Sequence, residues 1–321
     1  YTSVGNPYPS NIDSELFMSA NGSVSTLYFW NNTGQAGMNY ATYTTLGGSP
    51  AGGGSETPTD FISVGQGFLV ESSSSSVTFN NEMRVSDATI FFKESTVEKH
   101  RFWLSLNNES NQNLNNILVG YMSGATQGVD NQIDGKQFAS QGSALYSIIS
   151  EEKFAIQGRA LPFENTDVVT LGFQAAEAGK FNISLSNFDG LFTEGEVTVY
   201  LKDRQLDIIH NLMESSYTFE SAAGEFKERF EVVYQTEGTM GIGDLASAAV
   251  LIYKNNQNIV VESKNEKILS VELFDLSGRN IHSNNKVNAN TYQIKSNAQG
   301  VLVVKVQTQN GEVVTKKVIN K

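Results

Sequence analysis

Polar and apolar residues alternate in short runs along the chain, and residues that favour turns separate these runs. In Lys180–Leu185 every second residue is apolar, which is typical of a strand with one face buried and the other in water. Helical patterns are weak throughout, and only Glu151–Lys153 is expected to open a short helical turn. The pattern therefore predicts an all-β fold, built as tandem antiparallel β-sandwiches.

The composition supports an all-β fold. The 321 residues include 28 Gly and 31 Asn, both of which favour tight turns or positive φ. Only 17% of the residues are charged, which is low for a chain of solvated helices. Gly47–Pro58 is rich in Gly, Ser and Pro, so we expect a mobile loop there.

Changes in composition divide the chain into four segments. We expect a β-rich block at residues 1–85, which can pack against a β-sandwich at residues 86–237. Residues 238–248 are small, Gly-rich and nearly uncharged, as in a linker. Residues 249–321 are expected to form a separate C-terminal domain. Whether residues 1–237 make one sandwich or two stays open at this point.

The C-terminal segment contains seven candidate strands, each bounded by Asn, Gly or Ser. Seven short strands at this spacing predict a small Greek-key sandwich. The last candidate strand places Lys316 and Lys317 among valines, and this suits an edge strand, where lysine discourages unwanted pairing. The candidate strands are Ala249–Tyr253, Asn258–Glu262, Ile268–Phe274, Arg279–His282, Thr291–Ile294, Val301–Gln307 and Glu312–Ile319.

Charge is divided unequally along the chain. The net charge is −12 and the pI is about 4.8, so nucleic acid is a poor partner, because binding it depends on Lys and Arg. Residues 249–321 hold ten basic and five acidic residues, a net charge of +5, which leaves −17 for the remainder. These opposite signs favour separate domains with separate partners, with chance as the simpler alternative.

Several classes of protein are excluded or disfavoured. The chain has no Cys, which excludes disulfide scaffolds, thiol nucleophiles and Cys-ligated metals. No apolar run approaches the length of a membrane span, and the N-terminus has no signal-peptide pattern. Because the chain opens with a strand-and-turn pattern, we expect it to be the C-terminal part of a longer protein.

Candidate catalytic and metal-binding residues are few. His100, His210 and His282 lie far apart, and there is no Gly-x-Ser-x-Gly motif, so we predict a non-enzymatic chain without an obligatory cofactor. Asp130, Gln132 and Asp134 place side-chain oxygens at alternate positions before a Gly, as a calcium loop does. The twelfth position of that loop is Gln141 instead of Glu, and a plain polar turn is the alternative.

Four aromatic residues near Gly-rich stretches are candidates for sugar binding. Aromatic rings can stack on the faces of sugars, although in sandwich strands they more often belong to the core. A surface glycan is therefore a candidate partner. The residues are Tyr28, Trp30, Tyr40 and Tyr43.

The C-terminal segment carries two motifs that occur together in one known family. Ile268–Arg279 fits the pattern V-x-hydrophobic-x-D/N-x-x-G-R, and Gly300–Val306 fits G-x-Y-x-V-K with Leu302 in the place of Tyr. A Gly and a Lys-rich strand close the chain. The residues that carry the match are Val271, Asp275, Gly278, Arg279, Gly300, Lys305, Gly311, Lys316 and Lys317.

In these residues the segment resembles the C-terminal sorting domain (type A) of the type IX secretion (Por) system, found at the ends of large surface and secreted proteins of Bacteroidota. The resemblance implies a domain that directs passage across the outer membrane after Sec-dependent export. It implies the type IX translocon, its outer-membrane shuttle and its sortase as partners, and a secreted or cell-surface location. The upstream sandwiches would then be spacer or adhesion modules. The alternative is that they are carbohydrate-binding modules attached to an enzyme that lies before Tyr1.

Overall fold

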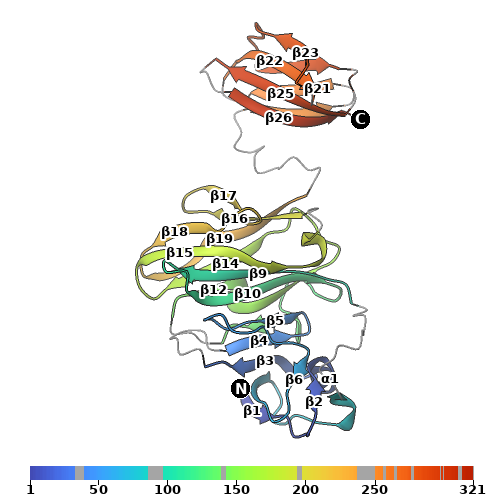
Figure 1. The fold of residues 1–321 in the computed structure, drawn as a ribbon, viewed down its shortest axis with the longest axis vertical. Coiled ribbons are helices and arrows are strands. Elements are labelled where there is room, and N and C mark those ends of the chain that lie inside the picture. Colours follow the sequence, from blue (N-terminus) through green and yellow to red (C-terminus); the bar gives the residue numbers. More distant parts are fainter. Residues whose placement is uncertain are drawn as a thin grey trace. The chain divides into compact units, whose positions relative to one another are not determined.

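The chain folds as two compact units, residues 1–238 and residues 239–321. The computed structural model describes residues 1–32, 40–85, 97–138, 142–193, 197–236, 250–255, 258–263, 266–275, 278–296, 298, 300–309 and 313–320. Strands dominate both units, and the described residues contain a single α-helix (Figure 1). The fold is therefore all-β, as the sequence predicts. The expected linker at residues 238–248 lies outside the described residues.

The first block contains a five-stranded sheet, a three-stranded sheet and the helix. The helix α1 (Ser14–Ala20) begins at Asp13, whose carboxylate accepts a hydrogen bond from the backbone of Leu16 at 2.9 Å. Phe17 and Met18 on this helix are fully buried in the core of the block. The larger sheet has the order β1 (Thr2–Gly5), β7 (Gly67–Ser72), β3 (Val24–Trp30), β4 (Tyr40–Thr44), β5 (Gly47–Ser49); the smaller has the order β6 (Phe61–Ile62), β2 (Asn11–Asp13), β8 (Arg84–Val85).

Residues 97–236 contribute a single eleven-stranded sheet that closes into a sandwich. Phe102 on one half and Phe173 and Phe230 on the other share one apolar core, so the two halves face each other. Its main path has the order β17 (Ile208–Asn211), β16 (Val197–Asp203), β19 (Gly224–Thr236), β14 (Val169–Ala175), β12 (Ala144–Ile149), β13 (Glu152–Ala160), β10 (Asn113–Met122), β9 (Lys99–Asn108), β15 (Gly179–Phe188), β18 (Tyr217–Ser221), and β11 (Gly135–Lys136) pairs with β13.

Two local features differ from the sequence-based expectations. Glu151–Lys153 forms no helical turn, because Ser150 and Glu151 have φ of 49° and 70° and make the tight turn between β12 and β13. Gly47–Pro58 is not wholly a loop, since its first three residues form β5 at the edge of the first sheet. In addition, β10 and β13 pair in parallel, whereas the other strand pairs of the described residues are antiparallel.

The first block and the large sandwich belong to the same compact unit. The indole of Trp103 on β9 donates to the carbonyl of Gly48 on β5 at 2.8 Å. Leu46 is buried beside Trp103 and Leu118 in a small apolar cluster. Residues 1–85 and 86–237 therefore share a buried interface.

The C-terminal unit is a seven-stranded sandwich with a core of its own. One sheet has three strands and the other four. The chain crosses between the sheets after the first hairpin, after the second hairpin and again after the single strand that follows, which gives the expected Greek-key connectivity. Val271, Leu273 and Val304 are fully buried between the sheets. The sheets have the orders β20 (Val250–Asn255), β21 (Asn258–Ser263), β24 (Thr291–Lys295) and β23 (Asn280–Asn284), β22 (Ile268–Asp275), β25 (Gly300–Thr308), β26 (Val313–Asn320).

Candidate functional site

Three motif residues of the C-terminal unit, Asp275, Gly278 and Arg279, lie together at the turn between β22 and β23. The backbone N–H of Gly278 donates to the carbonyl of Asp275 at 3.0 Å, and Gly278 has a φ of 81°. The Asp275 carboxylate accepts from the backbone N–H and from Nε of Arg279, each at 3.0 Å. Because a left-handed residue closes this turn, the spacing D-x-x-G-R has a direct structural cause.

The other motif residues lie in the same four-stranded sheet. Val271 is buried on β22, and the Lys305 ammonium on β25 lies 3.9 Å from Glu272 on β22. Gly300 opens β25 with a φ of 100°. The backbones of Lys316 and Lys317 on β26 pair with β25, and β26 is the edge of the sheet. Gly311 lies outside the described residues.

The predicted calcium loop contacts the first block. Gln132 donates its amide to the carbonyls of Met18 at 2.6 Å and Val24 at 3.1 Å. The Asp130 carboxylate accepts from the backbone N–H and the hydroxyl of Thr126. These contacts give the loop a structural role as a polar turn that joins two parts of one unit. Within the described residues, no group of three or more His, Asp or Glu side chains is arranged to hold a metal ion, and the calcium site stays a prediction.

Asp134 is the most perturbed carboxyl of this loop. It is 3% exposed, and burial raises its pKa to about 6. Its two oxygens accept from the backbone N–H groups of Asp130 at 2.6 Å and Gly158 at 2.7 Å, which opposes part of that shift. The carboxyl thus ties the loop to β13.

The four candidate aromatic residues fall into two groups. Tyr28 and Tyr43 are buried, and their hydroxyls donate to the carbonyl of Lys136 and to Asp60, so both are core residues. Trp30 is 58% exposed, and its ring lies 5.0 Å from that of Tyr40 across the β3–β4 pair. Of the four residues, Trp30 is the one that is largely exposed, and sugar binding stays a prediction.

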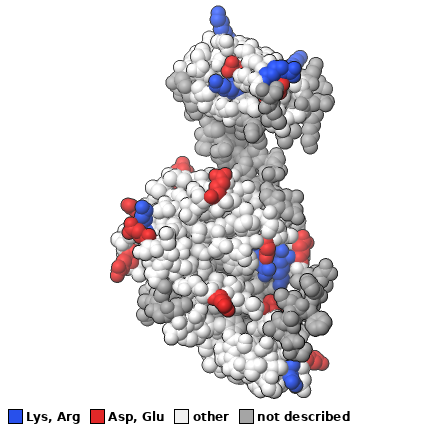
Figure 2. Space-filling view, viewed as in Figure 1, with Lys and Arg blue, Asp and Glu red and all other residues white. Residues whose placement is uncertain are grey.

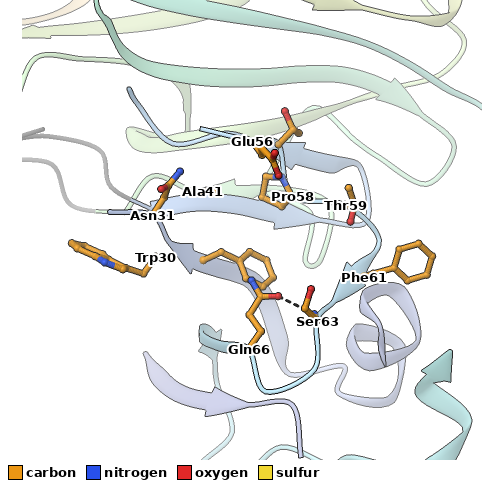
Figure 3. A pocket seen from close by; sticks show the side chains of 11 residues that line it. Trp30, Asn31, Ala41, Glu56, Pro58, Thr59, Phe61, Ser63 and Gln66 are labelled. Carbon is orange, nitrogen blue, oxygen red and sulfur yellow. Dashed lines mark hydrogen bonds between the residues drawn. The ribbon is translucent and has the colours of Figure 1, made fainter. Parts of the chain in front are cut away.

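Trp30 lies at a pocket of about 400 Å³ in the first block (Figure 3). The indole extends from the end of β3 and points away from Pro58 and Gln66, whereas Glu56, Pro58 and Thr59 come from the segment between β5 and β6. Gln66, between β6 and β7, completes the lining on another side. The sequence pattern gave no reason to choose Glu56 or Gln66, because strand pairing brings them beside Trp30.

A second pocket, of about 330 Å³, lies where the first block meets the large sandwich. Trp103, Asn113 and Asn116 contribute to its lining, together with Thr57, which also lines the Trp30 pocket. Asn116 donates to the carbonyl of Ala51 and to Asn113, and Trp103 donates to Gly48. The polar groups of this pocket therefore serve the interface.

The three histidines have local partners in separate places. The Nε2 atoms of His210 and His282 lie 2.9 Å from the carbonyl of Ser215 and 3.1 Å from the hydroxyl of Tyr292. His100 accepts from the backbone of Leu191 at 3.2 Å and lies beside Glu98.

The face drawn in Figure 2 is mostly uncharged, with small groups of acidic and basic side chains.

Comparison with known families matches each of the two units. A domain of unknown function, DUF8693, matches residues 1–234, and a second, DUF8694, matches residues 240–320. The fold and the matches define a two-part all-β protein. The chain belongs to the DUF8693 family. None of the curated proteins matches it. In the part of the chain that the structure describes, no helix has the length and apolarity to cross a membrane.

Proposed function

We propose that this chain is part of an exported protein whose C-terminal unit is the sorting signal for type IX secretion, and whose upstream unit is a spacer or adhesion module. The observation that carries the proposal is the hairpin tip at Asp275–Arg279. It presents the Arg279 side chain, which is 77% exposed, on a sandwich that has its own apolar core.

A self-contained sandwich suits a signal that is recognised in its folded state. All the residues of its apolar core come from residues 250–318, so a partner can bind this unit without unfolding the upstream unit. The edge strand β26 offers a second contact, because an edge strand can pair with a strand of another protein. The translocon, its shuttle and its sortase are the proposed partners, and the cell surface or the medium is the proposed location.

The first experiment removes the signal. We expect a chain that lacks residues 249–321 to accumulate in the periplasm of a bacterium with a type IX system, whereas the complete chain reaches the surface or the medium. Secretion of the truncated chain at the level of the complete one would reject the sorting role.

A second experiment separates recognition from folding. Arg279→Ala removes an exposed charge whose ion pair is worth at most about 1 kcal/mol, so the fold should persist while export falls. Lys295→Ala, an exposed basic position on the other sheet, is the matched control and should export normally. Normal export of the Arg279 variant would reject the hairpin tip as the recognised feature.

Carbohydrate binding by the upstream unit is a second candidate function. The largely exposed indole of Trp30, which lies against Tyr40, supports it, because an exposed aromatic ring can stack on the face of a sugar. Neither function assigns a catalytic step to this chain.

A further inference from the structure

The neighbouring strands β15, β9 and β10 carry six Asn and Ser residues on the face of the sheet that points away from the core. The residues that alternate with them, such as Leu104, Leu106 and Ile183, are buried in the core of the sandwich. The strand register places the six residues in two rows across the strands, and we call them the Asn/Ser face. The rows are Asn182–Asn107–Asn113 and Ser184–Ser105–Asn116.

This composition is unusual for the middle of a sheet. Asn is depleted in β-strands, yet four of the six residues are Asn. A local preference that is broken several times at one place is expected at a functional or strained site. The contact with the first block accounts for Asn116, which donates to the carbonyl of Ala51 at 3.1 Å. It does not account for Asn107, Asn182 and Ser184, because their side-chain hydrogen bonds stay within the sandwich.

The side chains of the Asn/Ser face orient one another. Asn107 donates its amide to Asn182 at 2.9 Å and accepts from the amide of Asn113 at 3.3 Å, and the Ser105 hydroxyl donates to Asn116 at 2.5 Å. The side-chain carbonyls of Asn107, Asn113 and Asn182 each accept one hydrogen bond, so each keeps a second lone pair. Groups that are held in place before a ligand arrives lose little ordering entropy on binding.

A pocket of about 330 Å³ lies where the first block contacts this face. Three of its lining residues, Trp103, Ser105 and Asn116, are at most 7% exposed, whereas Thr57 and Ser186 are exposed. The pocket therefore has a buried floor and an open rim. Its volume lies within the range of small-ligand pockets.

The lining of the pocket selects the class of ligand. None of the described residues that line it is charged, so an anion would find no Lys or Arg and a cation no carboxylate. An apolar ligand would cover polar groups without bonding to them. A proline-rich peptide is usually held by exposed aromatic rings, and the ring in this lining, Trp103, is nearly buried. A neutral sugar fits, because its hydroxyls both donate and accept hydrogen bonds.

We propose that the Asn/Ser face and its pocket bind a neutral sugar of a glycan. Ser105 and Asn113 are its hydroxyl partners inside the pocket, and Thr57 is its partner at the rim. Asn107 and Asn182 continue the site along the sheet beyond the pocket. The inference rests on the carbohydrate binding proposed for the upstream unit and is independent of the sorting role.

The test is a screen of the complete chain on an array of neutral and acidic oligosaccharides, followed by titration calorimetry with the strongest neutral glycan. Within the described residues the Thr57 hydroxyl has no hydrogen-bond partner, so Thr57→Ala should leave the thermal unfolding midpoint unchanged. It should weaken binding about threefold to tenfold through one lost hydrogen bond. Ser186→Trp places a large ring at the rim and should weaken binding at least about tenfold.

Matched controls are Thr59→Ala and Ser75→Trp, which change exposed residues of the first block outside this pocket and should leave binding unchanged. Equal binding by the unmodified chain, Thr57→Ala and Ser186→Trp overturns the site. If Trp30→Ala alone then abolishes binding, carbohydrate binding stands as a function and only the site is wrong. Failure to bind any neutral glycan, or binding confined to acidic glycans, overturns the site and the neutral-sugar function together.

Discussion

Arg279 contacts Asp275 across the tip of the β22–β23 hairpin through two hydrogen bonds, from its backbone N–H and from its Nε, each 3.0 Å long. Gly278 precedes Arg279 in the left-handed conformation. The backbone hydrogen bond fixes the turn, whereas the Arg279 side chain is largely exposed and contributes little to folding. The motif therefore combines residues required by the turn with one that is available to a partner.

Gly278→Ala should lower the unfolding free energy of the C-terminal unit by about 1–2 kcal/mol, because an L-residue with a Cβ is strained at a φ of 81°. Apart from the chain neighbours of Gly278, no atom of the described residues lies within 4 Å of the added Cβ, so the cost comes from the backbone conformation. Gly278→Asn should recover part of the loss, because Asn tolerates this conformation. Hydrogen exchange in β22 and β23 measures the effect, and equal losses in both variants would contradict the argument.

The strands of the C-terminal unit could be predicted closely because each is delimited by local turn residues. For example, the sequence predicts strands at Ile268–Phe274 and Val301–Gln307, and the structure has strands at Ile268–Asp275 and Gly300–Thr308. In contrast, the helix α1 was not predicted, because seven residues are too few to show a helical period and the main sequence signal for this helix is the N-cap residue Asp13. Strand β5 was not predicted, because Gly47–Ser49 has no alternating side-chain pattern. Its position depends on contacts of Gly48 with Trp103 and Pro58.

The candidate sites show the same limit. Trp30 could be selected from its residue type, whereas Glu56 and Gln66 could not, because they become neighbours of Trp30 only through the pairing of β3, β4 and β7 and the return of the chain at β6. Tyr28 and Tyr43 looked equivalent to Trp30 in the sequence, yet their positions in the sheet bury them. Residue type indicated the chemistry, and non-local pairing decided which groups are available.

Asp203 and Arg229 form an ion pair inside the large sandwich, and its loss should be costly. The Asp203 Oδ2 accepts from Nη2 of Arg229 at 3.0 Å and from the hydroxyl of Tyr217 at 3.1 Å. The two charged side chains are 0% and 4% exposed. Asp203→Ala leaves the guanidinium buried without its carboxylate, so we expect a loss of about 3–5 kcal/mol in urea unfolding. The exposed pair Lys136–Glu152 is the control, and Lys136→Ala should cost less than about 1 kcal/mol; similar losses in both variants would refute the distinction.

Asp134 should titrate with a pKa of about 6, above its ordinary value of 3.8, because burial disfavours the carboxylate. The folded chain then binds a proton between about pH 6 and pH 4 that the unfolded chain does not bind. The free energy of unfolding therefore rises as the pH falls through that window, by about 2–3 kcal/mol in total. Above about pH 6 the buried carboxylate lowers the free energy of unfolding by a constant amount. Carboxyl ¹³C NMR measures the titration, with Asp134→Asn to assign the signal, and a midpoint near 3.8 would contradict the expectation.

The loop from Asp130 to Asp134 also predicts how the chain responds to calcium. The two carboxylates of this loop already accept hydrogen bonds from Thr126, Gly158 and the backbone of Asp130. Gln132 donates its amide N–H groups to neighbouring carbonyls. A cation would therefore have to displace existing hydrogen-bond partners. We therefore expect the midpoint of thermal unfolding to be the same in EGTA and in millimolar CaCl₂. A calcium-loop role requires the opposite result, because a ligand at a hundred times its Kd adds about 2.7 kcal/mol and raises the midpoint by several degrees. A bound cation would also hold Asp134 ionised and bring its pKa below 6. The midpoint of thermal unfolding and the pKa of Asp134 measured by NMR would then have to change together. The Asp130→Asn variant would have to show neither change.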